Sequence, residues 1–314
     1  MILAIHLHIV LTGAVYHLFL LPEEQTKENT MIITNKLGLP DAFVKMAQQN
    51  EKMADNEIRV TSLLNGLCEE ELKRRYYGEI VQDVSDMIWM LFGTAAHAVL
   101  ESQDESDTQF KEERLKMKVS NSILTGKSDL YDAKTKTITD YKTTSVWKII
   151  YQDYETWEKQ LMIYAALWIN AGFPVEKCEI VAILKDHSKT KAKLDPNYPQ
   201  LPVQKITFTV TKERLAEIQE FIETRVAERE ALRDLKDEEL PICTLAERYN
   251  DGDKYAVMQN NKKKALRVLD NYNEAKEWMK NNGGDYINVR AGENKKCKEY
   301  CAVKDFCPHM KGRI

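Results

Sequence analysis

The stretch "LTGKSDLYDAKTKTITDYKTTS" (residues 124–145) decides the fold. It contains two strand-like runs joined by the turn-forming segment "DAKTK", with Asp129 in the first run and Asp140 in the second. Side chains alternate faces along a strand, so Asp140 and Lys142 should point to the same face. If the two runs pair, Asp129 lies beside Asp140, and neighbouring carboxylates repel each other unless a cation lies between them. The pattern predicts a site for Mg²⁺ or Mn²⁺; the alternative is a solvated hairpin whose charges keep a sheet edge soluble.

The elements around this stretch predict an α/β fold. Apolar residues recur at the spacing of amphipathic helices over residues 68–102, 153–171 and 211–236. Runs rich in β-branched residues predict strands at 114–120, 122–132, 136–145, 177–186 and 203–210. This order is typical of a mixed central sheet flanked by helices and not of a doubly wound nucleotide-binding fold. The sequence also has neither a GxGxxG motif nor a P-loop lysine motif.

The net charge narrows the classes of function. The 314 residues carry a formal net charge of -4, and the pI is about 6.0. A protein that coats DNA passively is therefore disfavoured, and any polyanion must be held by local basic patches or metal ions. One such patch is the run "NNKKKALR" (residues 260–267), which suits either DNA phosphates or a solvated turn.

The predicted helices on either side of the opening stretch each carry a polar pair. "GTAAHAVLE" places His97 and Glu101 four residues apart on one helical face, and "QLMIYAAL" does the same for Gln160 and Tyr164. Each pair has an ordinary structural alternative: a packed or surface histidine in the first helix, and a hydrogen bond between helices in the second.

Taken in order, the motifs are Gly-x3-His-x3-Glu, Gly-x2-Asp, Asp-Tyr-Lys-Thr and Gln-x3-Tyr. This set resembles the PD-(D/E)XK nuclease superfamily, in the RecB-like branch that includes CRISPR-associated and AddB-type exonucleases. The resemblance covers about residues 60–310. It implies a restriction-endonuclease-like core, in which helices flank a mixed central sheet.

The resemblance also implies roles for single residues. Asp129 and Asp140 are similar to the metal-binding acids of the family, and Lys142 is similar to its catalytic lysine. The implied metal ligands are His97, Asp129, Asp140 and the backbone carbonyl of Tyr141. On the flanking helices, the residues implied to support the site or to contact DNA are Gln160, Tyr164 and Glu101. Glu112 or Glu113 stands before the first of these strands, but no spacing rule fixes a part for either.

The C-terminal sequence "CKEYCAVKDFCPH" reads Cys-x3-Cys-x5-Cys and predicts a metal site. Three thiolates need a fourth ligand to complete either tetrahedral zinc or a four-iron cluster. The resemblance favours a [4Fe-4S] cluster, with Zn²⁺ as the alternative. Its ligands would be Cys297, Cys301, Cys307 and a distant cysteine, for which Cys243 is preferred and Cys68 is the alternative; His309 is a weaker substitute. Cys178 lies in an apolar strand pattern and is expected in the core.

Three segments are expected along the chain. Residues 1–30 read as an apolar N-terminal extension ahead of Met31; residues 1–22, which contain no charged side chain, also fit a marginal transmembrane helix. Residues 31–240 should form the nuclease core, and residues 241–314 a small strand-strand-helix-strand unit clasped by the cysteines. We expect no membrane association unless residues 1–22 belong to the native protein, and a cytoplasmic location.

The resemblance implies a metal-dependent deoxyribonuclease, an exonuclease acting on DNA in recombination, repair or phage replication, with a partner protein from such a pathway. The alternative is a catalytically silent DNA-binding or assembly subunit with a structural cluster. Because Asp129, Asp140 and Lys142 are all present, the sequence favours the enzyme.

Overall fold

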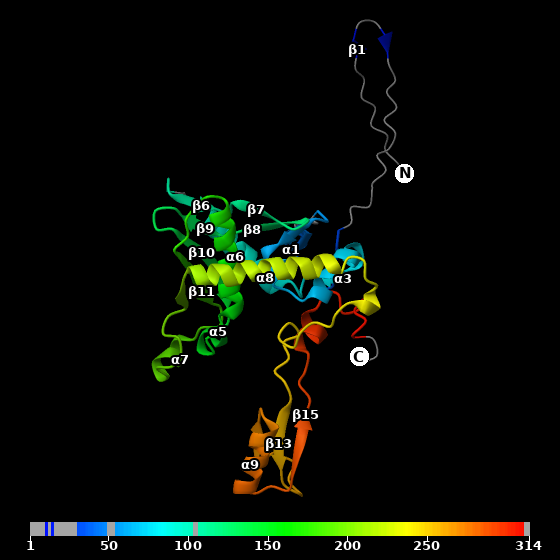
Figure 1. Cartoon of the computed structure of the whole chain (residues 1–314), viewed down its shortest axis with the longest axis vertical. Helices are drawn as coiled ribbons and strands as arrows, with labels where there is room; N and C mark the ends of the chain where they lie inside the picture. The colour runs from blue at the N-terminus through cyan, green and yellow to red at the C-terminus, as the bar shows by residue number, and fades with distance from the viewer. Residues whose placement is uncertain (1–9, 12–13, 16–29, 49–53, 103–105, 311–314) are drawn as a thin grey trace.

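The computed structural model describes residues 10–11, 14–15, 30–48, 54–102 and 106–310. Its centre is a five-stranded mixed sheet in the order β12-β11-β10-β9-β6 (Figure 1). Only β10 and β11 are parallel; the other neighbours are antiparallel. The strands are β6 (Gln109–Lys111), β9 (Leu130–Asp132), β10 (Thr137–Thr144), β11 (Lys177–Leu184) and β12 (Val203–Thr209). The predicted α/β fold with a mixed central sheet is confirmed.

Two long helices pack against each other beside this sheet. Figure 1 shows α8 (Lys212–Ala231) crossing the core beside α6 (Glu155–Asn170), and α6 contacts both β10 and β11. The core between them is apolar and aromatic: the rings of Tyr131 and Trp168 stack with their centroids 4.2 Å apart. Because β11 is buried on both faces, its run "KCEIVAIL" is almost continuously apolar.

The expected strand 122–132 is wrong as a single element. The chain forms β8 (Ser122–Lys127) in a second sheet of order β4-β8-β7, then turns at Ser128 and Asp129 and enters the central sheet as β9. Ser128 accepts a hydrogen bond of 2.9 Å from the Trp168 indole, and Asp129 accepts one of 2.6 Å from the backbone of Tyr141. Both side chains thus bind other parts of the core at the break. The remaining strands of this sheet are β4 (Glu57–Arg59) and β7 (Arg114–Val119).

The expected helix 68–102 is also wrong as a continuous element. It divides into α3 (Leu67–Tyr76) and α4 (Ile88–Glu101), with the short strand β5 (Val81–Asp83) between them. β5 pairs in parallel with β3 (Ile32–Thr34), a partner 49 residues upstream that helical periodicity does not reveal. Asp83 stabilises the join because its carboxylate accepts hydrogen bonds from Thr34, Ser85 and the backbone of Lys36.

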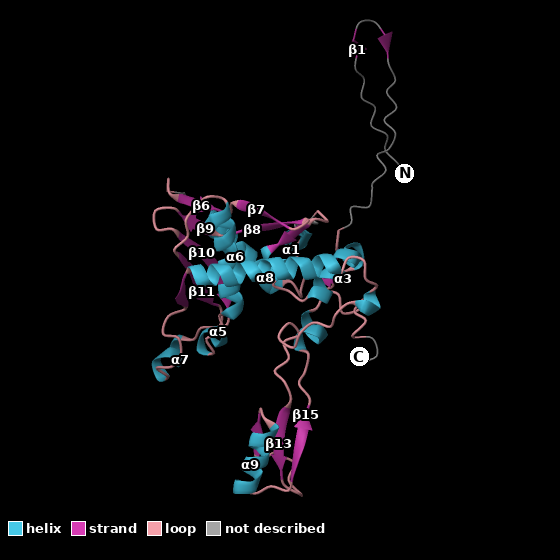
Figure 2. Cartoon of the chain, viewed as in Figure 1, coloured by secondary structure: helices cyan, strands magenta, loops and turns pink. Residues whose placement is uncertain are grey.

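The C-terminal unit extends away from the core (Figures 1 and 2). It is an antiparallel sheet of order β14-β13-β15 with one helix, in the chain order β13 (Lys254–Met258), β14 (Arg267–Leu269), α9 (Tyr272–Asn282), β15 (Tyr286–Arg290). A π-helical turn η3 (Lys296–Tyr300) then leads back to α3. The other described elements are β1 (Val10–Leu11), β2 (Ala14–Val15), α1 (Asp41–Gln48), α2 (Val60–Leu63), η1 (Tyr77–Glu79), α5 (Val146–Ile150), α7 (Lys189–Leu194) and η2 (Asp237–Glu239). Among the described residues, no helix has the length and apolarity needed to cross a membrane.

Candidate active site

The predicted catalytic side chains come from three neighbouring elements. His97 lies on α4, Asp129 lies in the turn between β8 and β9, and β10 carries Asp140, Tyr141 and Lys142. α4 packs against β10 at Gly93, where a Cβ atom would stand 3.5 Å from Thr143 Oγ1, an ordinary contact. The packing of α4 on β10 therefore sets the position of His97 relative to the strand.

His97 joins Asp129 to the backbone of β10. Its Nδ1 lies 3.1 Å from Asp129 Oδ1, and its Nε2 lies 2.9 Å from the carbonyl oxygen of Tyr141. The other carboxylate oxygen of Asp129 accepts the hydrogen bond from the Tyr141 backbone N–H. The Asp129 carboxylate raises the pKa of His97, because an imidazolium can donate to both oxygen acceptors.

Asp140 is a buried acid, only 2% exposed. Burial raises the pKa of Asp140, and the nearby Lys142 ammonium partly opposes that shift. Lys142 Nζ stands 2.6 Å from Asp140 Oδ2 as an ion pair, yet its angles are not those of a hydrogen bond. Within the described part of the chain, Asp140 Oδ2 accepts no hydrogen bond. The Lys142 ammonium is therefore the cationic partner of this buried oxygen.

Glu112 is a site residue whose position the sequence could not fix. The ligand atoms of His97, Glu112 and Asp129 all lie within 4.8 Å of one another, whereas Asp140 is not part of that group. Glu112 adopts a positive φ of 55°, its backbone N–H donates to Asp129 O, and its carboxylate pairs with Lys127. The left-handed turn before β7 is what points this acid back toward Asp129, and no motif spacing encodes such a turn.

Gln160 and Tyr164 lie beneath the site on α6. Gln160 Nε2 donates a hydrogen bond of 3.0 Å to Tyr164 Oη, so the bond lies within one helix and not between two. Burial, followed by the Asp140 charge, raises the pKa of Tyr164. The Tyr164 ring packs under Gly126 of β8, where a Cβ atom would come within 2.9 Å of its Cε1. This close approach explains the glycine of the Gly-x2-Asp motif. The side chain of Glu101, at the end of α4, is outside the described residues.

The donor set fits a hard divalent cation. It combines carboxylates, one imidazole and one backbone carbonyl, and the His97–Glu112–Asp129 side encloses a cavity of about 20 Å³. Oxygen ligands of this kind suit Mg²⁺ and Mn²⁺, and an added imidazole is compatible with Mn²⁺. The observation that favours a cation here is that the ligand atoms of His97, Glu112 and Asp129 all lie within 4.8 Å of one another.

The match to known families settles the class of protein. Residues 41–308 match the family model of the PD-(D/E)XK nuclease superfamily. The chain belongs to this superfamily. No curated protein matches the chain in sequence.

Solved structures similar to the PD-(D/E)XK chain include the following three, all at low identity. The crystal structure of SSO0001 shares 17% identity, with a TM-score of 0.43, over 66% of this chain and 91% of that one. A phage-related exonuclease from Haemophilus somnus 129PT shares 15%, with a TM-score of 0.35, over 56% and 94%. The alkaline exonuclease LHK-Exo from Laribacter hongkongensis shares 12%, with a TM-score of 0.34, over 57% and 90%.

The cysteines converge between α3 and the C-terminal segment. The Cys68 thiol is 1% exposed, and the neighbouring Cys243 and Cys307 raise its pKa, so both candidates for the fourth ligand lie close together. These three thiols and Cys301 pack in one apolar cluster, with Cys297 half-buried nearby. Cys178 is a core residue, as predicted. The His309 ring faces the carbonyl of Leu240, 2.8 Å away.

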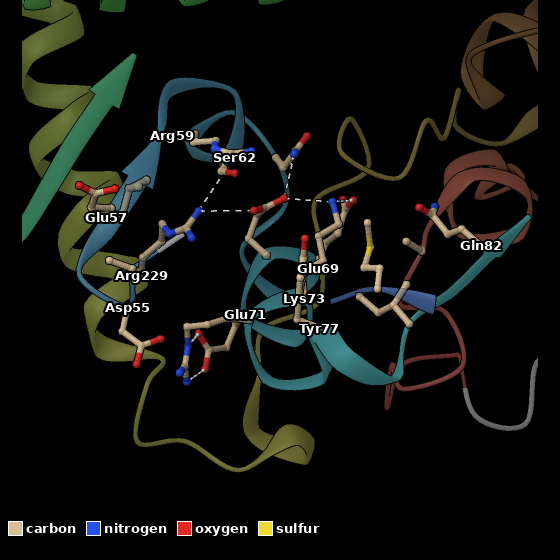
Figure 3. A pocket seen from close by; sticks show the side chains of 18 of the residues that line it. Asp55, Glu57, Arg59, Ser62, Glu69, Glu71, Lys73, Tyr77, Gln82 and Arg229 are labelled. Carbon is tan, nitrogen blue, oxygen red and sulfur yellow. Dashed lines mark hydrogen bonds and ion pairs between the residues drawn. The ribbon is translucent and has the colours of Figure 1, made fainter. Parts of the chain in front are cut away.

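A larger cavity, of about 390 Å³, lies along α3 (Figure 3). Its charged lining is internally paired: Lys73 lies 2.7 Å from Glu69, and Arg74 lies 2.7 Å from Glu71. Burial lowers the pKa of Arg229, which donates to the carbonyl of Ser62. Since these cations already have partners, we interpret the residues that line this cavity as a charge network that joins α3 to α8.

Proposed function

We propose that the chain is a metal-dependent deoxyribonuclease that degrades DNA from its ends. The observation that carries this is the meeting of His97, Asp129, Asp140 and Lys142 at β10, the middle strand of the central sheet, in a member of a nuclease superfamily. The exonuclease assignment follows from the order of the motifs, which resembles that of the RecB-like exonucleases. The alternative, a silent DNA-binding subunit, finds no support because every acid and the lysine remain in place.

The acids and the imidazole of the site would bind the metal ion. Asp129, Asp140, His97 and the Tyr141 carbonyl would hold Mg²⁺ or Mn²⁺, and Glu112 joins them as an additional acid. When bound, such a cation lowers the pKa of water and offsets charge on a phosphoryl oxygen. The Tyr141 N–H fixes one oxygen of Asp129, and burial restricts Asp140, so the acids are preorganised by the strand.

Lys142 is the partly exposed positive charge of the site. Its side chain is 23% exposed, so the ammonium reaches the surface while staying beside Asp140. There it orients the attacking water and offsets the charge that develops on the phosphate as the P–O bond to the leaving strand breaks. Gln160 and Tyr164 position this arrangement from α6, below the strand.

We also propose a metal site at the converging cysteines, a [4Fe-4S] cluster in preference to Zn²⁺. What supports this site is that Cys68, Cys243, Cys301 and Cys307 lie in one apolar cluster; among the described residues, no three of the cysteine sulfurs lie within 4.8 Å of one another. Cys297, Cys301 and Cys307 would supply three ligands, and Cys243 the fourth, with Cys68 as the alternative. On this basis residues 31–240 form the nuclease core and residues 241–314 a unit clasped by the cluster. Recombination, repair or phage replication would provide the DNA ends and a partner protein.

The test is degradation of end-labelled DNA by anaerobically purified protein with Mn²⁺, beside Lys142→Ala. Stepwise shortening by the parent and none by the variant supports the proposal. Internal cuts without stepwise products contradict the exonuclease assignment. No degradation by either protein, with iron bound, favours the silent subunit.

A further inference from the structure

The sheet of the C-terminal unit has one covered face and one open face. α9 covers the face that carries Tyr255 and Val257: the Tyr255 ring lies 5.6 Å from that of Tyr272, at the start of α9. Since neighbours in register share a face, the opposite face carries the side chains of Val268, Tyr286, Asn288 and Arg290. All four are exposed.

Unpaired cations border this open face. A shallow groove of about 420 Å³ is lined by Lys263, Lys264, Ala265, Val268 and Arg290. Within the described residues, Lys263, Lys264 and Arg290 form no ion pair with a carboxylate, whereas the nearby Lys254 pairs with Asp270 at 2.7 Å. These cations are therefore available to an anionic partner.

The unit's charge is opposite to that of the chain. Residues 251–292 contain eight Lys and Arg against six Asp and Glu, whereas the whole chain has 45 against 49. Val268 gives the groove an apolar side chain that is 44% exposed, and Tyr286, which is 45% exposed, lies outside the groove on the same face of the sheet. Cations that track phosphates beside a ring that stacks on a base are the combination that binds single-stranded nucleic acid without regard to sequence.

We propose that this open face, defined as Lys263, Lys264, Val268, Tyr286 and Arg290, binds single-stranded DNA. The inference rests on the proposed function in that DNA is taken as the substrate. A duplex hides its bases from a flat face, so the tyrosine favours an unpaired strand. Because the unit extends away from the core, the face holds a strand that the active site is not cutting (Figure 1). It would keep the enzyme on a long substrate between cleavage steps.

The experiment measures binding separately from cleavage, with the full chain in metal-free buffer. Lys263→Ala/Lys264→Ala is compared with Lys276→Ala/Lys280→Ala, which removes the same charge from exposed positions on α9, at the covered face. The probe is a fluorescent oligothymidylate, titrated at several salt concentrations. Each phosphate contact on a single strand contributes about 0.7 to the slope of log affinity against log salt, so two lost contacts weaken binding about tenfold near 0.15 M salt and lower the slope by about 1.4. Tyr286→Ala should weaken binding further, while Tyr286→Phe keeps the stacking ring.

The outcomes separate this site from the catalytic one. Weaker binding by the 263/264 variant only, together with shorter runs of degradation on long DNA and an unchanged rate on short oligonucleotides, supports the face. Equal affinities and salt slopes for the two double variants overturn it, as does tighter binding of duplex than of single strand through the same residues. If the parent degrades no DNA but binding still depends on Lys263 and Lys264, the face stands and the proposed catalytic function fails.

Discussion

Replacing Asp140 by Asn tests the catalytic assignment most directly. The isosteric amide keeps the shape of a side chain that is 2% exposed but removes the charge that would hold a cation. We expect cleavage to fall by at least about 10²-fold, the cost of removing one preorganised electrostatic group. Stability should change little. The substitution removes the ion pair with Lys142, but it also removes the free-energy cost of burying a charged carboxylate, so the two effects offset each other. The lysine side chain is 23% exposed, so its ammonium can rotate to face the solvent.

The expected change in unfolding free energy is within about 1 kcal/mol, or roughly 2–4 °C in Tm for a domain of this size. End-labelled DNA with Mn²⁺ reports cleavage, and thermal denaturation in metal-free buffer reports stability. Glu179→Gln is the matched control: it is another nearly buried acid, 9% exposed, on the neighbouring β11, and it pairs with Lys205 at 2.7 Å. Full activity of Asp140→Asn, or a Tm loss above about 10 °C, would refute the reasoning, because Asp140 would then be a structural residue.

Four further substitutions test other parts of the structure. Glu112→Gln should weaken Mn²⁺ binding about 10- to 100-fold if this acid supports the metal; unchanged calorimetric titration would remove it from the site. Gly126→Ala should destabilise the fold by about 1–3 kcal/mol in urea unfolding, because a Cβ there would lie 2.6 Å from a leucine of α6; an unaffected midpoint would show that α6 moves aside. Hydrogen bonds from Ser85, Lys36 and Thr34 hold the pKa of Asp83 below its usual value, so its stabilisation is full above about pH 4 and is lost as pH falls further. Asp83→Asn should therefore lower the unfolding free energy at pH 7 and make it depend less on pH below about pH 4. Equal pH dependence of the parent and the variant in that range would contradict this. Cys301→Ser should lower both bound metal and Tm more than Cys178→Ser does, and equal Tm values would contradict a metal site at the cysteines.

Local patterns predicted the elements that stay in one environment. The strands at β10, β11 and β12 and the helices α6 and α8 agree with the expected ranges to within a few residues, because each packs into the same hydrophobic core along its length. Two of the predicted elements were wrong, because tertiary contacts override the periodicity of the sequence there. β5 depends on pairing with β3, and the break between β8 and β9 depends on contacts made by Ser128 and Asp129. Neither contact leaves a periodic trace in the sequence.

The same distinction holds at the site. Alternation along a strand was enough to place Asp140 and Lys142 together, and their side-chain atoms are 2.6 Å apart. The approach of Asp129 to the Tyr141 backbone and to His97 depends instead on the turn after β8 and on the packing of α4. The sequence could not predict the position of Glu112, because its orientation comes from a single residue in the left-handed conformation. Many sequences tolerate such a residue before a strand.

The C-terminal segment shows why the cysteines matter to the open face. The segment is fastened to α3 by several independent contacts: Lys296 pairs with Glu69 at 2.5 Å, and the rings of Tyr76 and Phe306 stack at 4.4 Å. The strand-strand-helix-strand unit lies between Cys243 and Cys297, so a metal held by both thiols would fix both ends of the unit to the nuclease core. Loss of that metal would leave the sheet itself intact, since its own hydrogen bonds and α9 hold it together. Removing the metal should therefore shorten runs of degradation on long DNA while leaving oligothymidylate affinity nearly unchanged. A parallel loss of affinity would mean that the face is built by the cysteine site and not by the sheet.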